Sequence, residues 1–413
     1  MTGNLTPWAI ALGLSLGPAV SNGLARFAYG LVLPAMQADL AWNYTQAGFL
    51  NTANAAGYLA GALLTFGLID RLGARRLFVL GIVLTPLTLL GSAAFDALAL
   101  QSLFRVAAGI AGAAIFICGG AMAATLFRDA PASNALAISL YFGGGGLGMI
   151  LSGTAIPLML DKVGDAAWPF AWLLLAGLAA LAVWPALRAA RACPEPARAQ
   201  VVAVPRLPLL QMAFCVLGYF LFAVGYIVYL TYLVAMMRAG GATPMLVAIN
   251  WTLLGLGVIA APFLWRPALS RSGGGGVLAL ACLATGAATL LPLGADGSTS
   301  VLLLSAAVFG LSFFMVPTAV TSFARKNLTE ALWGRAVAMF TTVFALGQII
   351  GPILAGRIAD VTGSLGQGMA AAGIVLLAGA AVSALQRPLP GTPHATPPTP
   401  GSRIPKPPVS RSP

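Results

Sequence analysis

The chain has 413 residues, of which 59% are hydrophobic and 8% are charged, and its formal net charge is +12. Water-soluble domains carry about a quarter charged residues, so this composition excludes an ordinary soluble domain. Positive charge alone would suit nucleic acid, but its placement between apolar stretches, described below, argues against nucleic acid as a partner.

Long apolar stretches follow one another along the chain. A segment of about 20 apolar residues crosses the roughly 30 Å hydrocarbon core as a helix, and a barrel strand would instead alternate every second residue. The sequence therefore predicts an all-α membrane protein with twelve transmembrane helices, at residues 8–35, 45–68, 77–95, 99–127, 135–160, 169–187, 209–237, 244–265, 277–294, 300–323, 335–357 and 368–386.

The longest polar interruption divides these spans six and six. We expect four parts: an N-terminal six-helix half (1–187), a cytoplasmic central loop (188–208), a C-terminal six-helix half (209–386) and a Pro-rich cytoplasmic tail (387–413). The tail cannot bury enough apolar area to offset the entropy of ordering it, so it is predicted to be disordered. It holds the single histidine, His394, so none is left for the membrane domain.

The basic residues are unevenly placed. If the N-terminus is cytoplasmic, 17 of the 22 Lys and Arg fall in cytoplasmic segments, Arg26 and Arg105 lie within spans, and only Lys162, Arg238 and Arg357 fall on the far side. This bias predicts a multi-pass membrane protein with both termini in the cytoplasm, and we expect the membrane to be a bacterial inner membrane. The four cysteines have no metal-site spacing, so we expect neither a metal nor a cofactor.

Two motifs carry a resemblance to a known family. They are Asp70-Arg71-Leu-Gly73-Ala-Arg75-Arg76 after the second span and Arg105-x-x-x-Gly109-x-x-Gly112 in the fourth. With six-plus-six spans, they resemble the major facilitator superfamily, whose loop signature reads Gly-x-x-x-Asp-Arg-x-Gly-Arg-Arg. The last two arginines here are displaced by one residue through Ala74.

A narrower resemblance lies near the start of the chain. Three segments are similar to the YbfB/YjiJ-type branch of that superfamily: Gly23-Leu-Ala-Arg26-Phe27-Ala-Tyr29, Leu33-Pro34-Ala-Met36 and Ala56-Gly57-Tyr58-Leu59-Ala60-Gly61. The branch implies no particular substrate. The superfamily implies two six-helix pseudo-repeats with a substrate site between them.

Two intramembrane arginines are candidate substrate ligands. A guanidinium within a span costs roughly 2.5–3.5 kcal/mol on insertion scales, so it must face a cavity or a partner. Arg26 is expected in the outer half of the membrane, where it pairs with a substrate carboxylate or phosphate. The alternative is an arginine that snorkels outward or bonds helix-end carbonyls. By resemblance, Arg105 is the cavity-facing arginine of the fourth helix; the alternative is a shallow arginine that reaches the lipid headgroups.

Further candidates are polar side chains at helical spacing. Asn51, Asn54 and Tyr58 share one face of the second span, where they bind either substrate or other helices. Tyr226 and Tyr229 belong to an aromatic stripe of the seventh span, and their hydroxyl groups need partners.

The remaining motif residues are predicted to act in conformational change and packing. The loop after the second span is interpreted as a latch that holds the halves together on the cytoplasmic side in one state. It consists of Asp70, Arg71, Gly73, Arg75 and Arg76, and Asp70 contacts either the N-terminal end of the eleventh span or Arg128. Glycines four residues apart are predicted to pack helices closely, at Gly144, Gly148, Gly347 and Gly351.

None of the ten acidic residues lies well inside a span, which argues against an intramembrane enzyme and against recognition of organic cations. We therefore expect a monomeric secondary active transporter that moves a small organic anion by alternating access. Facilitated diffusion and proton symport both stay open as modes of coupling. The alternative function is export of amphipathic or drug-like compounds through a cavity lined by aromatic residues.

Overall fold

The computed structural model describes residues 5–196, 207–294 and 298–390, and these residues form helices and connecting turns without a strand. Twelve helices are long and apolar enough to cross a membrane, as the sequence predicted. The predicted tail beyond residue 390, with His394, and residues 197–206 of the predicted central loop lie outside the described residues.

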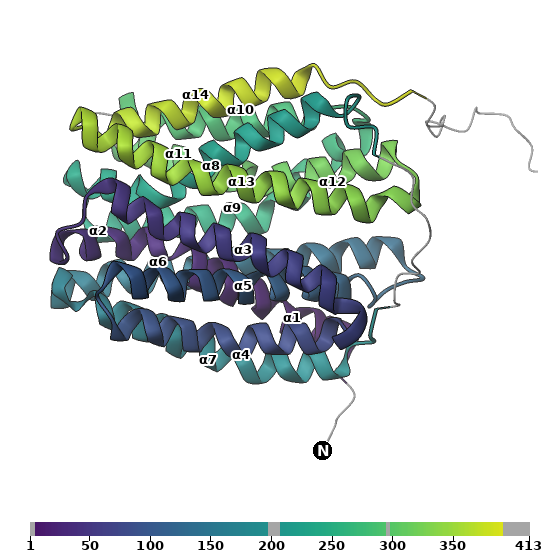
Figure 1. Ribbon diagram of the computed structural model, residues 1–413, viewed down its shortest axis with the longest axis horizontal. Coiled ribbons are helices and arrows are strands. Elements are labelled where there is room, and N and C mark those ends of the chain that lie inside the picture. The colour runs from purple at the N-terminus through teal and green to yellow at the C-terminus, as the bar shows by residue number, and fades with distance from the viewer. Residues whose placement is uncertain (1–4, 197–206, 295–297, 391–413) are drawn as a thin grey trace, which may run out of the picture.

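The first six spans form the N-terminal half and the last six form the C-terminal half (Figure 1). The N-terminal half consists of α1 (Pro7–Pro18), the π-helix η1 (Ala19–Phe27), α2 (Tyr29–Asp39), α3 (Tyr44–Leu72), α4 (Ala74–Ala94), α5 (Leu98–Ala123), α6 (Pro131–Val163), η2 (Asp165–Ala167) and α7 (Trp168–Ala192). The C-terminal half consists of α8 (Ala213–Ala239), α9 (Pro244–Arg271), α10 (Gly276–Leu290), η3 (Leu291–Gly294), α11 (Thr299–Ser312), α12 (Met315–Asn327), α13 (Glu330–Thr362) and α14 (Leu365–Ala384).

Several helices extend beyond the apolar stretches that predicted them. The eleventh span was expected over 335–357, whereas α13 has 33 residues. Helix α7 includes the first five residues of the expected central loop, 188–192. A helix of 33 residues is about 50 Å long, which exceeds the roughly 30 Å hydrocarbon core. Hydropathy marks only the part of a helix in lipid, so the polar ends were missed.

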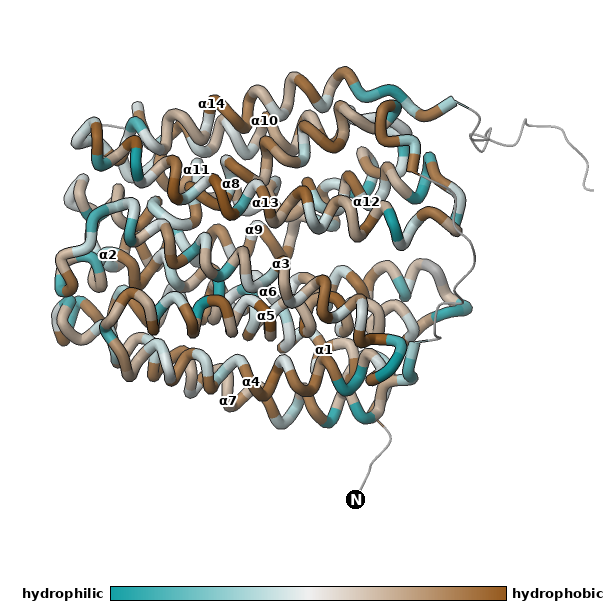
Figure 2. The backbone as a smooth tube through the Cα atoms, viewed as in Figure 1, coloured by the Kyte–Doolittle hydropathy of each residue, from teal (hydrophilic) through white to brown (hydrophobic). Residues whose placement is uncertain are grey.

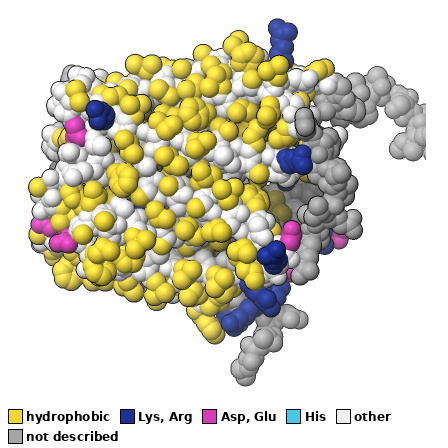
Figure 3. Space-filling view, viewed as in Figure 1, with side chains coloured by type: hydrophobic (Ala, Val, Ile, Leu, Met, Phe, Trp, Pro, Cys, Tyr) yellow, Lys and Arg dark blue, Asp and Glu magenta, His cyan; other side chains and the backbone are white. Residues whose placement is uncertain are grey.

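The bundle has two distinct ends (Figure 1). One end, called the terminal end here, carries the start of α1, the turn between α3 and α4, and the end of α14. The other end is called the opposite end. The backbone is most polar near the two ends (Figure 2), and on the face shown in Figure 3 an apolar band separates them, with most of the visible Lys and Arg at the terminal end.

Small residues let the helices of each half approach closely. A Cβ atom added to Gly148 would lie 2.2 Å from the Ala19 carbonyl oxygen, and one on Gly144 would lie 1.8 Å from that of Ser15. In the C-terminal half, a Cβ on Gly351 would lie 2.2 Å from the Val224 oxygen. The fifth and eleventh spans therefore each press backbone against the first helix of their own half, and Gly347 does the same beside Phe220.

The halves are joined at the opposite end. Asp360 of α13 accepts hydrogen bonds from the backbone nitrogens of Tyr44 (2.8 Å) and Thr45 (2.9 Å) at the start of α3. The Nη2 atom of Arg238, at the end of α8, donates to both carboxylate oxygens of Asp165, at 2.7 and 2.9 Å. These contacts connect charged or helix-terminal groups of the two halves, so they fasten this end closed.

At the terminal end, the side chains of Arg75 and Lys326 each contact groups of their own half. Arg75 donates to the Cys193 carbonyl oxygen at 2.7 Å and approaches Glu195, all in the N-terminal half. Lys326 donates to the carbonyl oxygens of Leu269 (2.6 Å) and Ser272 (2.8 Å), all in the C-terminal half. Each half thus ties its own loops together at the end where the chain begins.

The glycine contacts generate a stability prediction. Gly148→Ala places a methyl group against backbone, and such overpacking costs about 1–3 kcal/mol, so the unfolding temperature of the detergent-purified protein is expected to fall by several degrees. Gly143→Ala is the matched control, because its nearest neighbour would be a side-chain carbon 4.0 Å away. Equal unfolding temperatures for the two variants would contradict the packing role of Gly148.

Candidate functional site

The first transmembrane span changes its helical geometry in its middle. Residues Ala19–Phe27 form a π-helix between α1 and α2, and Pro18 immediately precedes it. Wider helical turns of this kind occur mostly as short insertions in α-helices, and such insertions are frequent at functional sites. A Cβ on Gly23 would lie 2.4 Å from the Gly148 Cα, so the π segment is held directly against α6. The π segment ends with Arg26 and Phe27, which places one of the two intramembrane arginines at its edge.

Arg26 lies between the two halves, three residues beyond the midpoint of the Pro7–Asp39 span. Its side chain is 6% exposed and donates a hydrogen bond to Oε1 of Gln348 on α13. The guanidinium carbon lies 5.1 Å from the centre of the Tyr58 ring. Among the described residues, no carboxylate contacts Arg26, so its positive charge is met only by neutral groups.

Gln348 connects Arg26 to the seventh span. Its amide nitrogen donates to the Tyr226 hydroxyl group at 2.7 Å, and the Tyr226 ring stacks on Phe222 with centroids 4.7 Å apart. Arg26, Gln348, Tyr226 and Tyr58 therefore form one continuous group, called the Arg26 cluster here. Tyr58, Tyr226 and Gln348 are all near the middle of their helices, so the cluster lies deep in the bundle.

Arg105 has a different environment. Its side chain is 1% exposed and donates to the carbonyl oxygens of Ala25 and Arg26, at the end of the π segment. The rings of Tyr29 and Trp172 lie 5.0 and 5.7 Å from its guanidinium carbon. The side chain is therefore enclosed by protein and does not reach the lipid headgroups, which was the alternative position.

The polar face of α3 contacts both arginines and the other half. Asn51 accepts from Arg105 at 3.3 Å and donates to the Thr231 hydroxyl group on α8 at 2.5 Å. Asn54 donates to the backbone oxygen of Arg105 at 3.0 Å. Tyr58 lies under Arg26. The two asparagines thus make interhelical hydrogen bonds, and Tyr58 is the member of this face that belongs to the Arg26 cluster.

Of the two tyrosines predicted in the seventh span, the structure brings only Tyr226 to Arg26. The Tyr229 hydroxyl group lies 2.7 Å from that of Ser305 on α11, and its ring stacks on Phe309 at 3.9 Å. Tyr229 is fully buried within the C-terminal half. Residues three apart on a helix differ in direction by about 60°, which is enough to turn Tyr229 away from the other half.

The residues of the predicted latch lie at the terminal end. Gly73 ends α3 with φ of 84°, a conformation that favours glycine, and this turn lets Arg75 approach Glu195. Arg71 and Arg76 are exposed, as are Asp70 and Arg128. Within the described part of the chain, Asp70 makes no hydrogen bond or ion pair with Arg128 or with α13.

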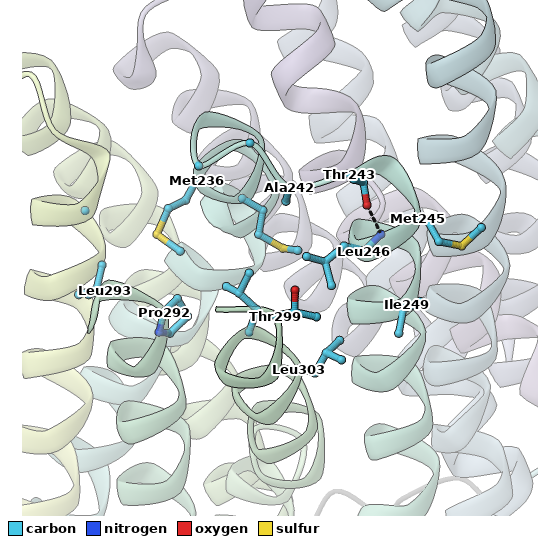
Figure 4. Close-up of a pocket in the computed structure, with 15 residues that line it drawn as sticks. Met236, Ala242, Thr243, Met245, Leu246, Ile249, Pro292, Leu293, Thr299 and Leu303 are labelled. Carbon is cyan, nitrogen blue, oxygen red and sulfur yellow. Dashed lines mark hydrogen bonds between the residues drawn. The ribbon is translucent and has the colours of Figure 1, made fainter. Parts of the chain in front are cut away.

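A separate pocket of about 630 Å³ lies at the opposite end of the C-terminal half (Figure 4). Its wall is mainly apolar, and Thr243 there caps α9 by accepting from the Leu246 nitrogen at 3.2 Å. None of the predicted site residues lines this pocket.

Comparisons with known proteins agree with this architecture. A family model described as "Uncharacterised MFS-type transporter YbfB" matches residues 18–384. A search of curated proteins finds no match. Among solved structures, a mutant of the nucleoside transporter NupG has a TM-score of 0.68 at 17% identity, covering 91% of this chain and 98% of that one.

A second similar structure is a bacterial homologue of the human lysosomal transporter Spinster. Its TM-score is 0.66 at 17% identity, with 92% of this chain and 96% of that chain covered. Identities this low show a shared fold alone, whereas the family model covers most of the sequence. The chain therefore belongs to the YbfB-type family of major facilitator superfamily transporters.

Proposed function

We propose that this transporter moves a small organic anion across a bacterial cytoplasmic membrane by alternating access. The observation that carries the proposal is Arg26, a nearly buried cation between the halves that no described carboxylate neutralises. A buried charge without a counter-charge is strongly unfavourable. Binding of an anion at Arg26 would therefore be favoured in two ways: the guanidinium donates two hydrogen bonds to it, and its own charge is neutralised.

Arg105 is assigned a supporting role in this proposal. Its donors are directed at the carbonyl oxygens of Ala25 and Arg26 and at the Asn51 side chain, and aromatic rings cover it. It therefore fixes the backbone that carries Arg26, and its charge adds to the positive potential at the site. Asn51 and Asn54 hold the same region, which leaves Arg26, Tyr58, Gln348 and Tyr226 as the groups that meet substrate.

Substrate binding is coupled to the arrangement of the halves through Gln348. The Arg26–Gln348 hydrogen bond joins the N-terminal half to the C-terminal half. A carboxylate that binds the guanidinium in a bidentate manner competes with the Gln348 oxygen for the same donors. Occupation of the site therefore changes a direct link between the halves, as alternating access requires.

The distribution of Lys and Arg indicates how the protein is oriented in the membrane. Most basic residues lie toward the terminal end, so we assign that end to the cytoplasm. The closed opposite end then faces outward, and the conformation is an inward-facing one. No described carboxylate contacts the Arg26 cluster, which favours uniport, or symport in which the substrate carries the proton, over a carboxylate proton relay.

The latch is proposed to work as one of two alternating helix caps. Helices α3 and α13 run antiparallel, and each carries an aspartate near its C-terminal end. Asp360 of α13 caps the N-terminus of α3 in this conformation. The N-cap residue of α13, Thr329, makes no side-chain capping bond. Asp70 of α3 is the matching acid at the terminal end, and it would cap α13 when that end closes.

Arg26→Lys tests the anion site. Lysine keeps the charge but loses the planar fork, so the apparent affinity for a transported acid is expected to weaken about tenfold in proteoliposome uptake. Arg26→Ala should nearly abolish uptake. Arg266→Ala, at an exposed position of α9, is the control and should transport normally. A fully active Arg26→Ala protein would sink the anion proposal.

Asp70→Asn and Asp360→Asn test the alternating caps. Each substitution removes a charged cap of about 1–2 kcal/mol, so the inward-facing population should rise with the first and fall with the second. Spin labels at the exposed positions Leu72 and Ala331 would report this as longer and shorter distances, respectively, across the terminal end. Asp129→Asn, exposed at the same end, serves as the control. Unchanged distances in both variants would contradict the mechanism.

The orientation is testable with a reporter that is active only outside the cytoplasm. A fusion after Gly241, at the opposite end, should be active, and one after Ser272, at the terminal end, should be silent. The reverse pattern would invert the assignment of the two ends.

A further inference from the structure

The proposed function leaves the kind of anion unspecified, and the groups around Arg26 restrict it. One guanidinium is within reach of a ligand, since Arg105 is 1% exposed and enclosed by Tyr29 and Trp172. A dianion or trianion at Arg26 would carry further negative charges, and among the described residues no second cation is accessible there to pair with them. A buried charge without a partner is costly, so the site fits a single negative charge.

Aromatic rings extend from the Arg26 cluster toward the terminal end on the C-terminal half. On α8, Tyr226 stacks on Phe222 (4.7 Å between centroids), and Phe222 stacks on Tyr219 (6.2 Å). On α13, Phe344 stacks on Tyr226 (5.5 Å) and on Tyr219 (5.1 Å). Phe344 is one helical turn before Gln348 and shares its face, and its ring is partly exposed.

The N-terminal half carries a second row of rings. The ring of Tyr58, which lies under Arg26, has its centroid 6.5 Å from that of Phe116 on α5. The centroids of Phe116 and Phe142, on α6, are 4.9 Å apart. Phe116 lies eleven residues after Arg105, so the two side chains project from nearly the same face of α5. Phe116 and Phe142 are both partly exposed. They lie toward the terminal end, as Phe344 does.

These two rows meet at Arg26 and end in partly exposed rings nearer the terminal end. Rings at such positions can stack on a planar apolar group, and their contribution adds to that of the buried area. Resting on the proposed anion function, we infer that the substrate is an amphipathic monoanion: a single carboxylate bound at Arg26, with an aromatic or similarly flat apolar body between the rows. The same geometry explains why an anion site stands beside so many aromatic side chains.

The inference is tested by binding of a matched probe series to the purified full-length protein. The probes are 3-phenylpropionate, its neutral amide, propionate and phthalate. Compared with 3-phenylpropionate, the amide lacks the negative charge, propionate lacks the aromatic ring, and phthalate carries a second carboxylate. 3-Phenylpropionate is expected to bind at least tenfold tighter than each of the other three. Its binding should disappear in Arg26→Ala.

The ring contribution is measured with Phe344→Leu, which keeps an apolar side chain without a flat face. The affinity for 3-phenylpropionate should fall about fivefold, roughly the value of one aromatic pair, while that for propionate stays constant. Phe263→Leu, in which a 60% exposed ring of the same half is replaced, is the matched control and should bind as the unsubstituted protein does. Phe116→Leu gives the same test from the other row, in case Phe344→Leu fails to fold.

The outcomes separate the two proposals. Equal or tighter Arg26-dependent binding of propionate or phthalate would overturn the amphipathic-monoanion inference and keep the anion transporter. Binding of 3-phenylpropionate that survives Arg26→Ala would overturn both. Loss of discrimination between 3-phenylpropionate and propionate in Phe344→Leu and Phe116→Leu, with Arg26 intact, would support the inference.

Discussion

The position of Arg26 is the constraint on which the rest of the central region depends. A guanidinium inside a bilayer-spanning bundle must be solvated by the protein itself. Here the protein supplies an amide oxygen and the face of an aromatic ring, and neither carries a full negative charge. The group therefore keeps a net attraction for an anion. A carboxylate of the protein beside the Arg26 guanidinium would neutralise its charge, and the attraction for a ligand anion would then be lost.

The surrounding structure serves to hold this charge in place. The π-helix brings Arg26 to the boundary between the halves, and its close approach to α6 at Gly23 leaves little freedom to move. Arg105 bonds the carbonyl oxygens at the end of that segment, so one buried arginine positions the backbone of the other. The motif that resembles the superfamily in the fourth span is thus structurally joined to the motif of the first.

The sequence predicted the fold and one face of the site, because both depend on local patterns. Hydropathy located all twelve spans, and the spacing of Asn51, Asn54 and Tyr58 placed them on one side of α3. The partner of Arg26 could not be predicted this way, since Gln348 is 322 residues distant and is brought near only by packing of the halves. The π-helix has no sequence signature of its own. Tyr229 looked equivalent to Tyr226, but one helical step turns it toward α11.

The antiparallel pair of α3 and α13 shows why the terminal end and the opposite end of the bundle should not be closed at the same time. They have 29 and 33 residues and contact each other on the side of the opposite end, where Thr52 donates to the Ile349 carbonyl oxygen at 2.7 Å. Rotation of one half about the middle of the bundle draws one pair of helix ends together as it separates the other. Capping at both ends would require bending a helix and breaking its backbone hydrogen bonds. In the mechanism that we propose, two weak caps therefore hold two conformations close in free energy, and the ligand proposed at Arg26 can bind in either.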